Sequence, residues 1–166
     1  MSDRILFGDE IRQKLLSGAN KLADAVASTL GPRGQNVILY RRGADPVITK
    51  DGVTVARVVE LEDDYEQAGV EVLRQAALRT NSVAGDGTTT STVLARAIME
   101  EANRHIVAGA ASIELKRGMD IAVEKIIKNL DKLATPVSSE EDIAHIATVS
   151  ANGDKSIGTL IATAVD

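Results

Sequence analysis

The segment Ala84 to Thr92, A-G-D-G-T-T-T-S-T, has the residue types of a phosphate-binding turn. Gly85 and Gly87 flank Asp86, and five hydroxyl-bearing residues follow before an apolar stretch begins. Glycine lets the backbone approach phosphate oxygens without a clash from Cβ. If a helix begins directly after the turn, its free N–H groups and its dipole favour an anion. The threonines at 88–90 would add hydroxyl donors in the first turn of that helix.

A carboxylate inside such a turn points to a metal ion as well, because Asp86 would repel a bare phosphate. A Mg²⁺ ion between the two reverses the sign, since Mg²⁺ binds one or two carboxylates together with substrate phosphates. The turn is not a Walker A loop, because G-x-x-x-x-G-K-[ST] does not occur in the chain. The residues alone leave two interpretations open: a metal–nucleotide site, or a flexible connector whose hydroxyls only cap the helix.

Two further glycine turns carry unusual residues. Lys50-Asp51-Gly52 either ends a strand or places Asp51 beside a transferred phosphate, where it would orient water. The turn 31–34, G-P-R-G, either stops a helix or matches the G-x-x-G clamp of RNA-binding KH modules. The second reading is disfavoured, because a KH loop joins two helices and this one leads into a strand. His105 and His145 are solitary and indicate helix surface.

Composition excludes several classes of function. The net charge is −5 and only three residues are aromatic, which argues against nucleic acid as a partner. The absence of cysteine excludes disulfides, zinc–thiolate sites and cysteine nucleophiles. No apolar stretch approaches the ~20 residues that span a bilayer, and the N-terminus lacks a signal-peptide pattern. We therefore expect a cytoplasmic protein with no membrane partner.

The elements that must position these turns are mainly helices, with one β-hairpin. We expect helices at Asp9–Leu30, Val53–Leu61, Asp64–Val83, Thr88–Val107 and, after Ser112 as cap, to about Leu133, and a hairpin of Asn36–Tyr40 with Pro46–Thr49. Gly18 lies inside the first helix, where glycine costs about 1 kcal/mol against alanine, so a close neighbour would explain it.

The periodicity also predicts the apolar residues that share one face of each helix, and for the helix Thr88–Val107 it predicts that this face points inward. These are Ile11, Leu15, Ala19, Leu22, Val26 and Leu30; then Ala68, Val72, Ala76 and Val83; then Val93, Leu94, Ala97 and Ile98; and then Leu115, Met119, Ala122, Ile126, Leu130 and Leu133.

Beyond Pro136 the pattern changes to two short helices. Ser138 with Glu141 predicts a capping box, and Asp154 predicts the cap of the last helix. The chain ends at 164–166 still in helical pattern, and we expect a cut rather than a natural end.

Several motifs in order resemble one family. They are T-L-G-P-R-G-Q-N-V at 29–37, I-T-K-D-G-V at 48–53, V-E-L-E-D at 59–63, A-G-D-G-T-T-T-S-T-V-L-A at 84–95, L-K-R-G-M-D at 115–120 and S-A-N-G-D at 150–154. Together they resemble the N-terminal portion of a group I chaperonin over essentially the whole chain.

This resemblance implies a fold and an activity. Residues 1–135 would be the N-terminal half of the equatorial ATP-binding domain, a helical bundle with a small β-hairpin, and 136–166 the first part of the intermediate domain. The family's subunits are ATPases that act as protein-folding isomerases. They form seven-membered homo-oligomeric rings, usually stacked in pairs, which enclose unfolded client proteins under a co-chaperonin lid.

The resemblance also assigns residues. Asp51 would assist the attacking water near the γ-phosphate. Asp86 would bind Mg²⁺, and a potassium ion would lie at Thr29, Lys50 and Thr89. The nucleotide, ATP, would be bound by Thr29, Leu30, Gly31, Pro32, Lys50, Gly52, Asp86, Gly87, Thr88, Thr89 and Thr90.

The chain also departs from the family pattern. Ser82 stands where the family usually has an aspartate, and the family's apical domain, its principal catalytic aspartate and its adenine-binding half have no counterpart here. We therefore expect this chain alone to lack full activity. The alternative reading is a short non-catalytic chaperonin-like module that binds nucleotide or joins rings without hydrolysis.

Overall fold

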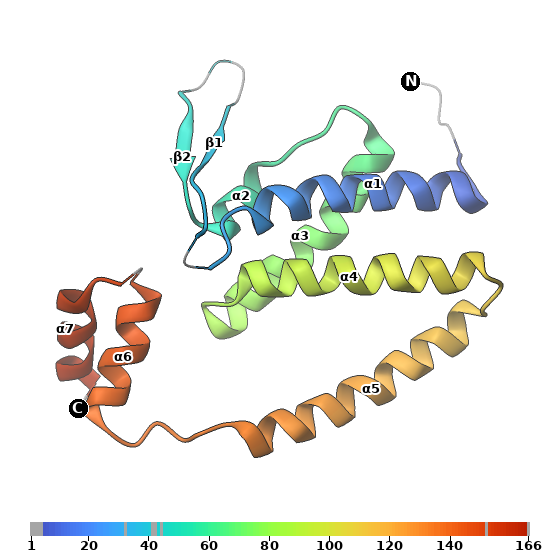
Figure 1. The fold of residues 1–166 in the computed structure, drawn as a ribbon. Helices are drawn as coiled ribbons and strands as arrows, with labels where there is room; N and C mark the ends of the chain where they lie inside the picture. Colours follow the sequence, from blue (N-terminus) through green and yellow to red (C-terminus); the bar gives the residue numbers. More distant parts are fainter. Residues whose placement is uncertain (1–4, 32, 41–42, 44, 152, 166) are drawn as a thin grey trace. The chain divides into compact units, whose positions relative to one another are not determined.

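The protein is mainly helical, as expected, with one small antiparallel sheet (Figure 1). The computed structural model describes residues 5–31, 33–40, 43, 45–151 and 153–165. Its elements are α1 (Gly8–Ala27), β1 (Val37–Leu39), β2 (Val47–Thr49), α2 (Gly52–Val58), α3 (Asp64–Ala84), α4 (Thr88–Val107), α5 (Ser112–Leu133), α6 (Glu140–Ser150) and α7 (Lys155–Val165). None of the helices in the described ranges is long and apolar enough to cross a membrane.

The chain packs as two units, residues 1–111 and 112–166. The first unit contains α1 to α4 and the hairpin, and the second contains α5 to α7. This division concerns packing. The predicted boundary between equatorial and intermediate domains at 135/136 stays a prediction.

The first unit is built around the contact of α1 with α3. A Cβ at Gly18 would lie 1.8 Å from the carbonyl oxygen of Glu66, and one at Gly69 would lie 2.0 Å from that of Leu15. The two helix backbones therefore touch directly, which explains the glycine inside α1. The inward residues of α1 match the prediction at Ala19, Leu22 and Val26, whereas Leu30 is exposed.

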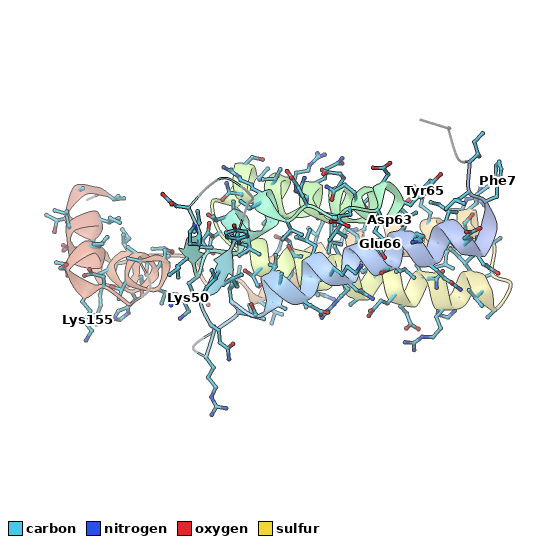
Figure 2. All side chains as sticks on the ribbon, turned by 90° about the horizontal axis from the view of Figure 1, so that it is seen from above. Phe7, Lys50, Asp63, Tyr65, Glu66 and Lys155 are labelled. Atoms are coloured by element: carbon cyan, nitrogen blue, oxygen red, sulfur yellow. The ribbon has the colours of Figure 1, made fainter. Side chains whose placement is uncertain are left out.

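Ion pairs align α1 and α3 at the same contact, and Figure 2 shows Asp63 and Glu66 beside α1. Lys14 Nζ donates to Asp63 Oδ2 at 2.6 Å, and Ser17 Oγ donates to Glu66 Oε1 at 2.8 Å. The bond from Lys14 holds the pKa of Asp63 below its usual range. The pKa of Glu66 is lowered by hydrogen bonds from Lys21 and Ser17. Both carboxylates are therefore stabilised in their charged form by α1.

The apolar stripe predicted for α3 is not its buried face, which is rotated from that stripe by about one residue. Ala68, Val72 and Val83 are exposed. The contact between Gly69 and α1 sets the rotation of the helix, and periodicity alone does not weigh a glycine as an inward residue. The buried residues are Gly69, Val70, Leu73 and Ala77.

The predicted inward face of α4 is also wrong at most of its positions. Leu94 and Ile98 are exposed, whereas Thr92 is fully buried. The Thr92 hydroxyl donates to the carbonyl of Thr88 at 2.8 Å, so this polar side chain enters the core with its hydrogen bond satisfied. The buried face runs through Thr88 and Thr92, with Ala95 and Met99 packed partly against the core.

The hairpin follows the prediction. Val37 pairs with Thr49, Ile38 with Ile48 and Leu39 with Val47. Leu39 packs in the core. The hairpin connects the end of α1 to the start of α2. Figure 2 shows Lys50, after β2, at the opposite end of this unit from Phe7.

In the second unit, α6 packs against α7. A Cβ at Gly158 would lie 2.0 Å from the Thr148 hydroxyl, so the two helices approach closely. The predicted cap Ser138 is wrong: Ser139 Oγ accepts the N–H of Asp142 at 3.1 Å. Ser138 and Ser139 are each followed by an acidic residue three positions later, and the N-cap of α6 is the second of these serines. Asp154 caps α7 as predicted, accepting from Ser156 N at 2.9 Å.

The apolar face predicted for α5 is exposed in this chain. α5 is described throughout and has no buried residue. Ile126 and Leu130 are more than half exposed. Periodicity identifies an amphipathic helix, but it does not say whether the covering surface lies within the same chain segment.

Candidate phosphate-binding site

The turn between α3 and α4 takes the geometry that its two glycines allow. Gly85 ends α3 with φ of 72°, and Gly87 is the N-cap of α4 with φ of 79°. Both angles lie in the left-handed region, which favours glycine. Among the described residues no side chain caps α4. The first N–H groups of a 20-residue helix are therefore available to an anion.

Asp86 is exposed between the two glycines. Its Oδ1 accepts the N–H of Gly87 at 2.6 Å, which fixes the carboxylate at the turn. Within the described residues no group of three or more His, Cys, Asp or Glu side chains could hold a metal ion alone. A site with one carboxylate suits Mg²⁺ that takes its other ligands from phosphates and water.

The three threonines at the start of α4 differ in exposure. Thr88 is buried and its carbonyl accepts the hydroxyls of Ser91 and Thr92, at 2.9 and 2.8 Å. Thr89 is half-buried and Thr90 is exposed. Thr88 could therefore offer its N–H, whereas Thr89 and Thr90 could also offer hydroxyls.

Asp51 is the N-cap of α2. Its carboxylate accepts from Val53 N at 3.2 Å, from Thr54 N at 2.9 Å and from the Thr54 hydroxyl at 2.6 Å. Partial burial raises the pKa of Asp51, but these bonds and the nearby charge of Arg57 together lower it below its usual value. Asp51 is therefore a carboxylate at neutral pH and a weak base, suited to orienting a water molecule.

Gly52 brings two other predicted residues together. A Cβ at Gly52 would lie 2.3 Å from Thr89 Oγ1 and 3.5 Å from Thr29 Oγ1. The start of α2 therefore lies against the start of α4 and the end of α1. Position 52 requires glycine because a Cβ there would clash with the Thr89 hydroxyl, and not because the backbone has an unusual φ.

At the end of α1, Thr29 is buried and its hydroxyl donates to the Val26 carbonyl at 2.7 Å. Leu30 is half exposed, and Gly31 has φ of 72°. The N–H of Gly34 donates to the carbonyl of Gly31 at 2.9 Å, which closes a turn. Pro32 lies outside the described residues, and Lys50 is exposed.

The structure thus brings Thr29, Gly52 and Thr89 into contact, and Asp51 adjoins Gly52 in the chain. Sequence reasoning missed Thr54, whose hydroxyl bonds the carboxylate of Asp51. The signal was present, because Asp51 is followed at the third helical position by a hydroxyl residue.

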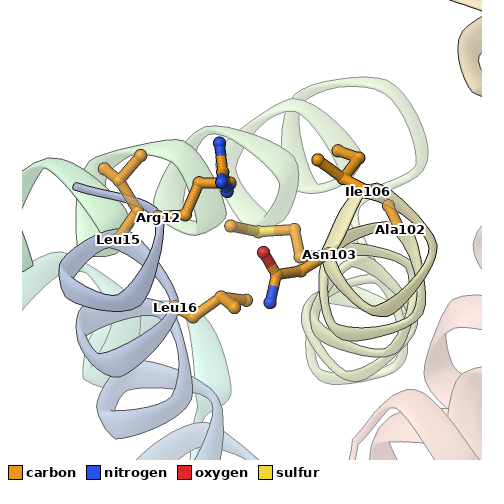
Figure 3. Close-up of a pocket in the computed structure, with 7 residues that line it drawn as sticks. Arg12, Leu15, Leu16, Ala102, Asn103 and Ile106 are labelled. Atoms are coloured by element: carbon orange, nitrogen blue, oxygen red, sulfur yellow. The ribbon is translucent and has the colours of Figure 1, made fainter. Parts of the chain in front are cut away.

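A separate groove lies between α1 and α4 (Figure 3), with a volume of about 200 Å³. It is mostly apolar and contains none of the predicted site residues. It is lined by Arg12, Leu15, Leu16, Met99, Ala102, Asn103 and Ile106.

The fold is that of a chaperonin equatorial domain, and comparison with known proteins gives the family. Residues 22–166 match the TCP-1/cpn60 chaperonin family, so the chain belongs to this family.

Two solved structures are similar to this chain. The chaperonin gp146 from the bacteriophage EL (Pseudomonas aeruginosa), solved in the presence of ATP-BeFx, is 28% identical with a TM-score of 0.76. A group III chaperonin in the open state is 26% identical with a TM-score of 0.79. Each similarity covers 93% of this chain but only 27% and 31% of those chains, respectively. The chain therefore spans less than a third of the chaperonins that it resembles.

Proposed function

We propose that this chain is the N-terminal portion of an ATP-dependent, group I-type chaperonin subunit that binds Mg-ATP at the junction of α1, α2 and α4. The observation that carries the proposal is the close approach of the Thr89 and Thr29 hydroxyls to Gly52, where an added Cβ would lie 2.3 and 3.5 Å from them, respectively. Residues from three distant parts of the sequence meet where a 20-residue helix presents uncapped N–H groups. A phosphate needs such a convergence of donors.

Each group of predicted residues would have its own role in binding the nucleotide and the metal ion. The N–H groups of residues 88–90 and the hydroxyls of Thr89 and Thr90 would bind phosphate oxygens, and Gly87, whose N–H is held by Asp86, would line the turn. Asp86 would hold Mg²⁺, which when bound neutralises phosphate charge. Asp51, ionised at neutral pH, would accept a hydrogen bond from the attacking water.

The end of α1 and the turn after β2 would complete the cradle. Leu30, Gly31 and Pro32 would line the nucleotide, with Lys50 and Gly52 opposite them. A potassium ion would be held by oxygens of Thr29, Lys50 and Thr89. The lysine would contribute its carbonyl, because its ammonium group cannot act as a ligand.

The proposed parent is a cytoplasmic ring of seven subunits, usually stacked in pairs, that encloses unfolded proteins under a co-chaperonin lid. Family membership and two chaperonin structures support a chaperonin subunit. The group I assignment, the ring size, the lid and the clients rest on the sequence motifs and are part of the proposal.

The decisive test is the effect of Mg-ATP on thermal unfolding of the 166-residue chain. A ligand that binds the folded state raises the midpoint. We expect a rise with Mg-ATP, and no rise for Asp86→Ala, which loses the metal ligand. Asp131→Ala on the exposed surface of α5 removes the same charge and should keep the rise. A wild-type chain with no rise at millimolar Mg-ATP would refute nucleotide binding.

A second candidate is a short chaperonin-like module that binds nucleotide without turnover. It predicts the same thermal shift but no phosphate release from bound ATP, whereas the first candidate predicts slow release. A single-turnover assay with excess protein separates the two.

A further inference from the structure

The carboxylate of Asp51 has one acceptor position left after its contacts with the protein. Oδ1 accepts from Val53 N, and Oδ2 accepts from both the N–H and the hydroxyl of Thr54. An ionised carboxylate offers about four lone-pair positions, two on each oxygen. Within the described residues, both positions of Oδ2 and one of Oδ1 are therefore filled. The open position is on Oδ1.

The hydroxyl of Thr54 is the bond that depends on the side chain. The two N–H groups would cap α2 with almost any residue at 53 and 54, because every N-cap carboxylate can accept them. The hydroxyl bond is also the shortest of the three, at 2.6 Å. Without it, Oδ2 would keep an open position of its own.

We propose that Thr54 is a positioning residue for Asp51: its hydroxyl occupies Oδ2, so that Oδ1 alone accepts a hydrogen bond from the attacking water. The inference rests on the proposed function, since it assigns an atom to the water-orienting role. Asp51 is joined directly to Gly52, against which the hydroxyls of Thr29 and Thr89 lie. A carboxylate fixed in one orientation at this point would hold water in one place.

Three variants separate this role from a general effect on the turn. Thr54→Val removes the hydroxyl but keeps the branched shape and the N–H group. Thr54→Ser restores the hydroxyl. Thr49→Val is the matched control, because the Thr49 hydroxyl accepts the N–H of Asp51 at 3.1 Å and does not bond its carboxylate.

The experiment measures three quantities on the 166-residue chain. They are the NMR chemical shift of the Asp51 carboxyl carbon at neutral pH, which reports its hydrogen bonds, the affinity for Mg-ATP and the single-turnover rate of ATP hydrolysis. In Thr54→Val we expect the Asp51 shift to change, the affinity to stay within about twofold and the rate to fall about tenfold, as for a misplaced reacting group. Thr54→Ser should restore the shift and the rate, and Thr49→Val should leave both near their wild-type values.

The outcomes that contradict the proposal are distinct from failure of the proposed function. An unchanged Asp51 carboxyl shift and rate in Thr54→Val, or an equal effect in Thr49→Val, would overturn it. A wild-type chain that binds Mg-ATP but never hydrolyses it would overturn the water-orienting role. Absence of Mg-ATP binding would refute the proposed function, and an unchanged Asp51 carboxyl shift in Thr54→Val would then still refute the contact.

Discussion

Gly52 is where the site depends most on a single residue. It is buried, and its missing side chain leaves room for the hydroxyl of Thr89. Glycine here is therefore required by packing, in contrast to Gly85 and Gly87, which are required by backbone angle.

We predict that Gly52→Ala lowers stability by about 1–3 kcal/mol, the usual cost of overpacking. The new Cβ would also force the Thr89 hydroxyl to rotate, so Mg-ATP binding should weaken. Urea unfolding followed by circular dichroism measures the first effect. Gly118→Ala in α5 is the control, because a Cβ there meets no atom within 4 Å. Equal stability of the two variants would show that the contact at Gly52 is not tight.

At the residue scale, the sequence predicted which residue types could bind phosphate and metal better than it predicted which of them lie close together. Asp86 between two glycines and Asp51 before a third stand out as residue types. The contact of residues 29, 52 and 89 could not be predicted, because it depends on how α1, α2 and α4 pack. Thr54 was overlooked because a hydroxyl inside a short helix is usually unremarkable.

Element positions were predicted well, because turns and caps are local signals. The predicted helix 88–107 has the observed bounds of α4, and that of 64–83 differs from α3 by one residue. Helix rotation was predicted less well. It depends on Gly69 facing Leu15 and on Thr92 satisfying its hydroxyl within its own helix, and neither residue is apolar enough to appear in a hydrophobic stripe.

The contact of α1 with α3 makes stability depend on pH. Asp63 and Glu66 have lowered pKa values, through bonds from Lys14 and from Lys21 with Ser17, respectively. A carboxylate whose pKa is lowered in the folded state stabilises the fold at pH values above the ordinary pKa of that carboxyl group. This stability is lost as the pH falls through the pKa of the folded state. We therefore predict that unfolding becomes easier below about pH 4.5.

Glu66→Gln tests this directly. It should lower stability at neutral pH and flatten the dependence on pH in the acid range, measured by urea unfolding at a series of pH values. Glu124→Gln on exposed α5 removes the same charge and serves as control. If Glu66→Gln kept the full wild-type dependence, the ion pairs with α1 would not be its source.

At the scale of the whole molecule, the predicted site belongs to only one of the two units. The predicted site lies entirely within residues 1–111, whereas α5 to α7 belong to the other unit. Exposed apolar residues lie along α4 and α5, including Leu94, Ile98 and Ile126.

The central claim is that three distant segments form one Mg-nucleotide site. Amide hydrogen exchange, measured with and without Mg-ATP, tests it most directly because it reports every segment at once. We predict slower exchange at 28–31, 51–54 and 86–90 together, unchanged exchange in α6 and α7, and no slowing in Asp86→Ala. Exchange that is unaffected at all three segments, or slowed only at the α1–α4 groove around 99–106, would contradict the claim.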